Sequence, residues 1–185
     1  MRKFLWLLTI LLCLSGCDSE NSALKEGMAF RDKLLSGQGC RFSVQITADY
    51  GEHLYYFEMD CAADSVGDMT FCVTAPESIA GIEGSLSYAG GTLDFADTAL
   101  QFDLLADDQL TPVSSPWILL KTLRSGYIAS ACYEEELLRL TVDDSYEEDA
   151  LRLDIWLRDE CPVRSDVLYD GKRILSMEVK DFEIL

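Results

Sequence analysis

The sequence predicts a mainly β protein of the α+β class. We expect a single strongly curved antiparallel sheet, an unclosed barrel, with an N-terminal helix and a second short helix covering its concave face. Three observations lead to this prediction. Apolar and polar residues alternate along many short segments, as in strands with one buried face. Turn residues separate these segments every few positions, which favours antiparallel pairing. Only two segments have helical spacing.

The N-terminal segment has the features of an export signal that ends in a lipidation site. Arg2 and Lys3 precede an apolar run over residues 4–14, and polar residues from Asp18 onward follow too soon for a membrane span. Leu14-Ser15-Gly16-Cys17 looks like a bacterial lipobox, in which the cysteine is acylated with a diacylglycerol and becomes the new N-terminus. An ordinary signal peptide with a chance cysteine is the alternative. We therefore expect a lipid-anchored protein on the extracytoplasmic face of the cell membrane.

Charge and composition limit the partners. The chain carries 33 acidic and 15 basic residues, a formal net charge of −18, which argues against nucleic-acid binding. The same charge repels anionic lipid head groups, so membrane attachment has to come from the lipid on Cys17. Hydrophobic residues make up 49% of the chain, enough for a folded domain. The predicted organisation is a lipoprotein signal peptide over residues 1–16, a flexible polar tether over residues 17–23 and one β domain over residues 24–185.

The helices are predicted from spacing and caps. Apolar residues recur at helical spacing over residues 22–36, and glycines follow as a stop. The residues of this pattern are Leu24, Met28, Arg31 and Leu35, with Phe30 and Leu34 beside them. Ser115 as N-cap and Pro116 in the first turn predict a second helix, which Gly126 ends.

A period of two begins at Cys40 and predicts a hairpin with a tight turn at Tyr50-Gly51. Its strands cover residues 40–47 and 52–61. A turn centred there places Cys40 opposite Cys61, within reach of a disulfide, although two buried free thiols are the alternative. Further strands are predicted over residues 68–74, 84–88, 92–95, 99–104, 127–133, 137–142, 151–157, 163–169 and 173–185. Asp170-Gly171 joins the last two and is the strongest hairpin signal.

Five cysteines remain once Cys13 leaves with the signal peptide and Cys17 takes the lipid. They are Cys40, Cys61, Cys72, Cys132 and Cys161. Cys72 lies on the polar face of its strand and is the predicted free thiol, which leaves Cys132 and Cys161 as a second disulfide candidate by elimination. There is no C-x-x-C pair and a single histidine, His53, so we expect no zinc site.

No catalytic motif emerges. The acidic run over residues 143–149 offers oxygen ligands for calcium, but it lacks the glycine and flanking helices of an EF-hand and is interpreted as a solvated loop. A nucleophile–histidine–acid triad would have to use His53, and no glycine-flanked serine elbow is present. We therefore predict a protein that is not an enzyme and has no metal or cofactor.

The two predicted helices are too few to cover so many strands, which leaves a concave apolar groove where hydrophobic ligands bind. The residues predicted to line it are Phe42, Val44, Tyr55, Phe57, Met59, Phe71, Trp117 and Leu120. The alternative is a groove filled by the protein's own Phe, Tyr and Trp side chains.

The order of these parts resembles the LolA/LolB-like superfamily. The parts are the lipobox, an amphipathic helix, a three-strand meander, the Pro76–Ile82 turn, the Ser115-Pro116-Trp117 helix and a final meander through Asp170-Gly171. More narrowly, the chain looks like lipoproteins of this fold from Gram-positive spore formers, including germination lipoproteins. The resemblance implies a curved sheet wrapped around helices. It also implies a lipid or other hydrophobic ligand in the groove; the alternative is a non-catalytic module that docks another envelope protein.

Overall fold

The structure, a computed structural model, describes residues 17–185 apart from residues 50, 52, 89, 95–109 and 148. The predicted signal peptide over residues 1–16 and the predicted strand over residues 99–104 lie outside the described residues. The described strands form one antiparallel sheet of ten strands, in the order β5-β4-β3-β2-β1-β10-β9-β8-β7-β6. The prediction of a single antiparallel sheet that does not close into a barrel is confirmed.

The helical segments are α2 (Cys17–Ser36), the short 3-10 helix η1 (Pro112–Ser114) and α3 (Ser115–Ser125). The strands are β1 (Gly39–Asp49), β2 (Leu54–Asp64), β3 (Met69–Ala75), β4 (Glu83–Ser87), β5 (Gly90–Asp94), β6 (Tyr127–Glu134), β7 (Leu137–Asp143), β8 (Arg152–Arg158), β9 (Cys161–Tyr169) and β10 (Lys172–Ile184). Two meanders, β1–β5 and β6–β10, meet where the first and last strands pair.

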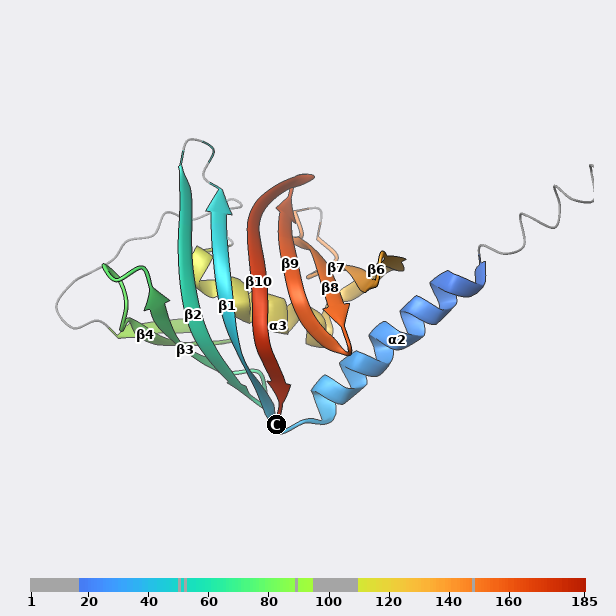
Figure 1. Ribbon diagram of the computed structural model, residues 1–185, viewed down its shortest axis with the longest axis horizontal. Coiled ribbons are helices and arrows are strands. Elements are labelled where there is room, and N and C mark those ends of the chain that lie inside the picture. Colours follow the sequence, from blue (N-terminus) through green and yellow to red (C-terminus); the bar gives the residue numbers. More distant parts are fainter. Residues whose placement is uncertain (1–16, 50, 52, 89, 95–109, 148) are drawn as a thin grey trace, which may run out of the picture.

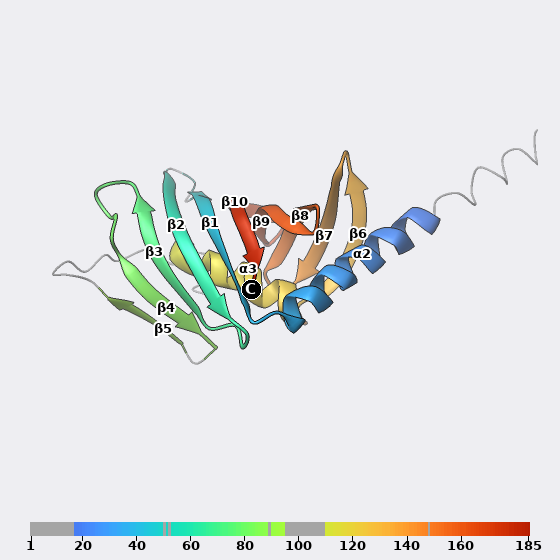
Figure 2. The ribbon, with the colours of Figure 1, turned by 60° about the horizontal axis from the view of Figure 1, so that its bottom comes forward.

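The sheet curves around α3, which crosses its concave face, while α2 packs beside β6 and β7 (Figures 1 and 2). The inward side chains of neighbouring strands make a continuous apolar core. Ile46 of β1, Met177 of β10, Ile155 of β8 and Leu140 of β7 are each at most 1% exposed. Strand alternation places these residues on one face, as the sequence predicted for Ile46.

The register of the first hairpin differs from the prediction. Asp49 pairs with Leu54, so Cys40 lies opposite Ala63 instead of Cys61. A shift by one residue pair keeps every side chain on its predicted face. Cys40 and Cys61 become diagonal neighbours, which lie about 7–8 Å apart, beyond the separation that a disulfide usually spans.

The N-terminal helix is longer than predicted, and it buries a different face. It begins at Cys17, so the segment predicted as a flexible tether over residues 17–23 is helical. Its buried residues are Ala23, Gly27, Phe30 and Leu34, whereas Leu24, Met28 and Leu35 are 39–45% exposed. A Cβ at Gly27 would lie 2.7 Å from a methyl carbon of Leu140, so that side chain would have to shift. Close packing on β7 therefore selects this face of the helix.

The second helix begins and ends near the predicted residues, but the contacts at its two ends differ from the predicted ones. Ser114 is the N-cap, and the Ser115 hydroxyl donates to the Pro112 carbonyl at 2.7 Å. Gly126 has an ordinary φ of −68°. Its missing side chain matters because a Cβ would lie 2.7 Å from Cγ1 of Val142. Helix α3 therefore ends at a glycine because β7 passes close by.

Candidate functional site

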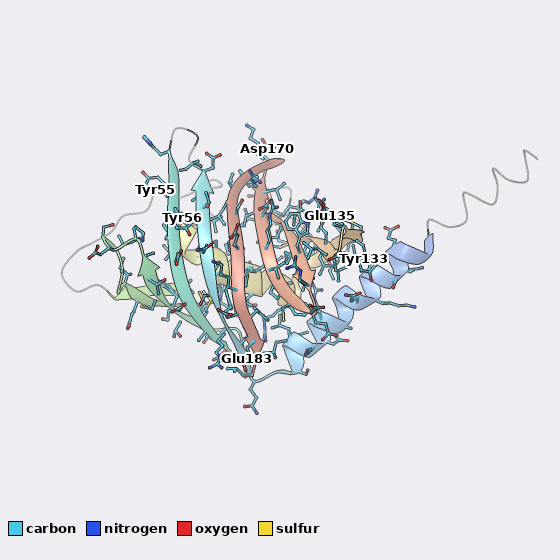
Figure 3. The ribbon with its side chains drawn as sticks, viewed as in Figure 1. Tyr55, Tyr56, Tyr133, Glu135, Asp170 and Glu183 are labelled. Atoms are coloured by element: carbon cyan, nitrogen blue, oxygen red, sulfur yellow. The ribbon has the colours of Figure 1, made fainter. Side chains whose placement is uncertain are left out.

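The predicted groove lies on the concave face but is filled in the described structure. Six of the eight predicted lining residues are 1–4% exposed and belong to the core: Phe42, Val44, Phe57, Met59, Phe71 and Leu120. Tyr55 is 49% exposed near the turn between β1 and β2 (Figure 3), and Trp117 is half-buried on α3. The inward residues of α3, among them Leu119 and Leu123, occupy the space between helix and sheet. The chain's own side chains thus fill this part of the interior.

Arg31 of α2 holds the C-terminal end of α3. Its Nε donates to the Leu123 carbonyl at 2.7 Å, and its Nη2 lies 3.5 Å from the Thr122 carbonyl. Carbonyls in the last turn of a helix lack partners within the helix, and a cation there also suits the helix dipole. Burial lowers the pKa of the Arg31 guanidinium from its ordinary value. The sequence predicted Arg31 as part of the helix pattern only, because its partners are backbone atoms nearly a hundred positions away.

The turn between β2 and β3 holds the other side of α3. Trp117 Nε1 donates to the Gly67 carbonyl at 3.1 Å, and Arg124 Nη2 donates to the Ser65 carbonyl at 2.6 Å. The Tyr88 ring meets Trp117 edge-on at 5.4 Å between centroids. Helix α3 is therefore fixed to the rim of the sheet by polar contacts and to the sheet itself by apolar ones.

Two hydroxyl groups beneath α3 have no hydrogen-bond partner among the described residues. Thr122 Oγ1 belongs to α3 and Ser165 Oγ to β9, and both residues are 0% exposed. An unsatisfied buried hydroxyl costs about 1–3 kcal/mol. The equally buried Ser115 hydroxyl, by contrast, has a partner, because it donates to the Pro112 carbonyl.

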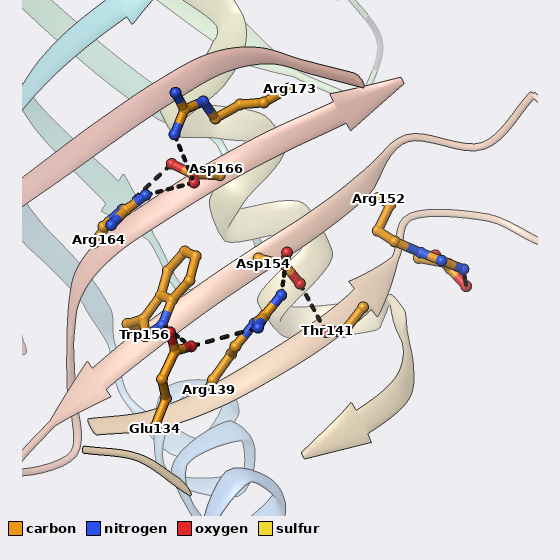
Figure 4. A network of polar contacts seen from close by, with 10 residues as sticks. Glu134, Arg139, Thr141, Arg152, Asp154, Trp156, Arg164, Asp166 and Arg173 are labelled. Atoms are coloured by element: carbon orange, nitrogen blue, oxygen red, sulfur yellow. Dashed lines mark hydrogen bonds and ion pairs between the residues drawn. The ribbon is translucent and has the colours of Figure 1, made fainter. Parts of the chain in front are cut away.

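A network of ion pairs on the convex face was not predicted from the sequence (Figure 4). Asp154 and Asp166 lie directly opposite each other on β8 and β9 and are only 8% and 6% exposed. Arg139 donates to Asp154 at 2.7 Å and Arg164 to Asp166 at 2.6 Å. The Trp156 ring lies between the two guanidinium groups, 5.3 Å from that of Arg139 and 4.5 Å from that of Arg164. The alternation along β8 indicates that Asp154 and Trp156 point outward. Only the pairing register of β8 with β7 and β9 brings them beside Arg139, Arg164 and Asp166.

Shallow hollows lined by described residues occur on the outside of the sheet. One of about 480 Å³ lies over β2, β3 and β4 and includes Cys72. Another of about 450 Å³ lies beside the acidic loop between β7 and β8. At the two ends of that loop Asp143 of β7 binds Arg152 of β8 at 2.7 Å, and Asp144 of the loop lies 3.5 Å from Lys121. Within the described part of the chain no helix is long and apolar enough to span a membrane, and no cluster of metal-ligating side chains occurs.

The predicted disulfides are not formed. All five cysteines from Cys40 onward are free thiols. Cys132 on β6 and Cys161 on β9 are separated by β7 and β8, about 14 Å across three strand spacings, so that pairing was wrong. Elimination failed because it ignored strand order, which a single sequence does not reveal.

The thiols should differ sharply in reactivity. Burial raises the pKa of the Cys40 thiol to about 11 and raises that of Cys61 as well, so neither forms a thiolate at pH 8. We expect iodoacetamide at pH 8 to label the exposed Cys132 in the native protein, and Cys40 and Cys61 only in urea, as peptide mass spectrometry can measure. The unfolded chain releases these protons near pH 9, so the free energy of unfolding should also fall above that pH. If the protein instead has a mass lower by two hydrogens, and two of its cysteines resist iodoacetamide even in urea, a disulfide is present.

The solved structures that are similar to this chain share little of its sequence. No protein-family model matches the sequence, and no curated protein matches it. An uncharacterised conserved protein from Thermus thermophilus matches in structure with 13% identity and a TM-score of 0.48, over 88% of this chain and 87% of that one. A LolA superfamily protein from Nitrosomonas europaea matches with 7% identity and a TM-score of 0.44, over 90% and 94%. The MucA/MucB complex from Pseudomonas aeruginosa matches with 8% identity and a TM-score of 0.40, over 85% and 56%.

These similarities assign no family to the chain, and its fold is described from its own sheet. The sheet itself provides the evidence: two antiparallel meanders join through β1 and β10, and the resulting open sheet curves around α3 with α2 beside it. The chain has the single, unclosed antiparallel sheet with two helices that its sequence predicted.

Proposed function

We propose that this chain is an extracytoplasmic binding protein, held at the cell membrane by a lipid on Cys17, that takes a lipid or other apolar ligand between α3 and the sheet. One observation carries the proposal. A single helix of 11 residues covers the centre of a large apolar interior, and polar side chains fix it at the rim. Breaking the contacts of Arg31, Trp117 and Arg124 would let α3 move without unpairing any strand.

The chemistry of the interior suits an amphiphilic ligand. The apolar residues of the sheet and of α3 would contact a hydrocarbon chain. The hydroxyls of Thr122 and Ser165 are available to a hydrogen-bonding head group. No described residue beneath α3 offers a metal site or a nucleophile–histidine pair, so we propose binding without catalysis.

Native mass spectrometry of membrane-extracted protein tests this function. We expect the mass of a chain that begins at an acylated Cys17, with adducts of lipid mass. Titration with oleic acid should give an apparent affinity about tenfold higher for Arg31→Ala than for the unchanged protein. The reason is that one hydrogen bond to a charged group contributes about 1.5–3 kcal/mol, and its loss raises the population of the open form. Ser125→Ala is the matched control, since that exposed α3 hydroxyl bonds only within its own helix.

The alternative is a non-catalytic module that docks another envelope protein. The burial of six predicted lining residues by the chain's own side chains favours it. The same experiment separates the two functions. If neither the unchanged protein nor Arg31→Ala takes up oleic acid, the interior is purely structural and the docking function is preferred.

A further inference from the structure

The convex face of the sheet, opposite α3, carries a hollow of about 270 Å³ over β2, β1, β10 and β9. Its floor consists of Thr47 and Ser176, which lie directly opposite each other on β1 and β10. Tyr56 flanks Thr47 on β2, and Arg164 of β9 stands on the other side. The hollow exists because two short side chains lie between two long ones on a rigid, fully paired part of the sheet.

Contacts outside the hollow hold the Arg164 side in place. The Asp166 carboxylate accepts from Arg164 Nη2 at 2.6 Å, and the Trp156 ring lies 4.5 Å from the guanidinium (Figure 4). Asp166 is 6% exposed and also lies 3.5 Å from Arg173. The guanidinium is thus neutralised and oriented before any ligand arrives.

Glu58 holds the opposite side in the same way. It accepts from the Tyr56 hydroxyl at 2.8 Å and from Gln45 Nε2 at 2.6 Å. This hydrogen bond between Tyr56 and Glu58 lowers the pKa of Glu58 and raises the pKa of Tyr56. Tyr56 lines the hollow and is 50% exposed; Figure 3 shows its position on β2. One carboxylate therefore fixes an aromatic ring and an amide together.

Several groups inside the hollow keep free hydrogen-bonding capacity. The hydroxyls of Thr47 and Ser176 and the carboxylate of Glu178 form no side-chain hydrogen bond with any described residue. Gln45 donates through its nitrogen to Glu58, which leaves its carbonyl oxygen available. These solvent-accessible donors and acceptors lie between walls that are already fixed. The site is therefore pre-organised, and little conformational entropy is lost on binding.

We propose that this convex hollow binds a carbohydrate. Sugar hydroxyls both donate and accept, which matches the mixed donors and acceptors of Thr47, Ser176 and Glu178, and the exposed Tyr56 ring offers an apolar face for the C–H side of a sugar ring. A peptide strand is disfavoured because β1 and β10 are central strands without a free edge. A free anion is disfavoured because Asp166 already neutralises Arg164 and Glu178 adds negative charge.

The test is a titration of the ¹⁵N-labelled protein with chitotriose, maltotriose and, as a peptide probe, pentalysine, followed by NMR. We expect one or both sugars to shift the amide signals of β1 and β10 around the hollow. Ser176→Tyr, which fills the floor, should abolish the shifts. Tyr56→Ala should weaken binding about tenfold, whereas Tyr56→Phe, which keeps the ring, should weaken it only a few-fold.

Tyr127→Ala is the matched control, since Tyr127 is 52% exposed but lies in the hollow beside the β7–β8 loop. Thermal midpoints verify that each variant is folded. The proposal fails if neither sugar shifts these signals, if Ser176→Tyr binds as well as the unchanged protein, or if pentalysine alone binds there. It concerns the face opposite α3, so its outcome is independent of oleic acid uptake.

Discussion

Replacing Leu34 by alanine should lower the free energy of unfolding by about 3 kcal/mol, whereas the same change at Leu35 should lower it by less than about 1 kcal/mol. The two leucines are neighbours in α2, and both substitutions remove the same side-chain atoms. Leu34 is 2% exposed and packs in the core, but Leu35 is 45% exposed. The first substitution leaves a cavity between helix and sheet, and the second removes mainly solvated surface.

Urea denaturation of both variants, followed by circular dichroism, measures the difference. Because the residues are adjacent, helix propensity changes equally in the two and cancels from the comparison. Equal losses, or a larger loss for Leu35→Ala, would mean that α2 packs through the Leu24–Met28–Leu35 face that the sequence pattern suggested.

Replacing Arg139 by alanine should cost about 3 kcal/mol, and replacing Arg152 less than about 1 kcal/mol. Each arginine binds an aspartate at 2.7 Å. Asp154, the partner of Arg139, is 8% exposed and would keep only the Thr141 hydroxyl as a side-chain donor. Arg152 is itself exposed, and water can replace it. Removing one partner of a buried pair is costly because the other charge stays buried.

Thermal unfolding at low ionic strength and again in 1 M salt tests this prediction. The effect of Arg152→Ala should shrink in salt, since exposed pairs are screened, while that of Arg139→Ala should persist. Asp154→Asn in the Arg139→Ala background is the control and should recover part of the loss by removing the stranded charge. If the two arginine variants behave alike, the convex network contributes no more than ordinary surface pairs.

Local sequence patterns predicted most of the fold. The alternation along Phe42–Ile46 and Met69–Val73 placed the correct side chains on the concave face, because a strand's period of two is a property of its own backbone. Asp170 and Gly171 have φ values of 48° and 70°, as the predicted tight hairpin requires. Faces and turns are local, so a single sequence can determine them.

The sites depended on partners distant in the chain. Cys132 and Cys161 were paired by elimination, which the strand order contradicts. Arg31 contacts the end of α3 because of how the two helices pack. Asp154 and Asp166 face each other because of the register between β8 and β9. Six of the eight residues predicted to line the groove are buried in the core, but whether space remained among them depended on how α3 packs.

The sequence alone therefore determined a curved antiparallel sheet with two helices, because hydrophobic periodicity and turn chemistry act within a few residues. Only the tertiary structure decided that α3 fills the concave face, that Phe30 and Leu34 anchor α2, and that polar side chains gather on the convex face. The physical reason is that packing and ion pairing join side chains from strands far apart in the chain, and their geometry follows from strand order and register.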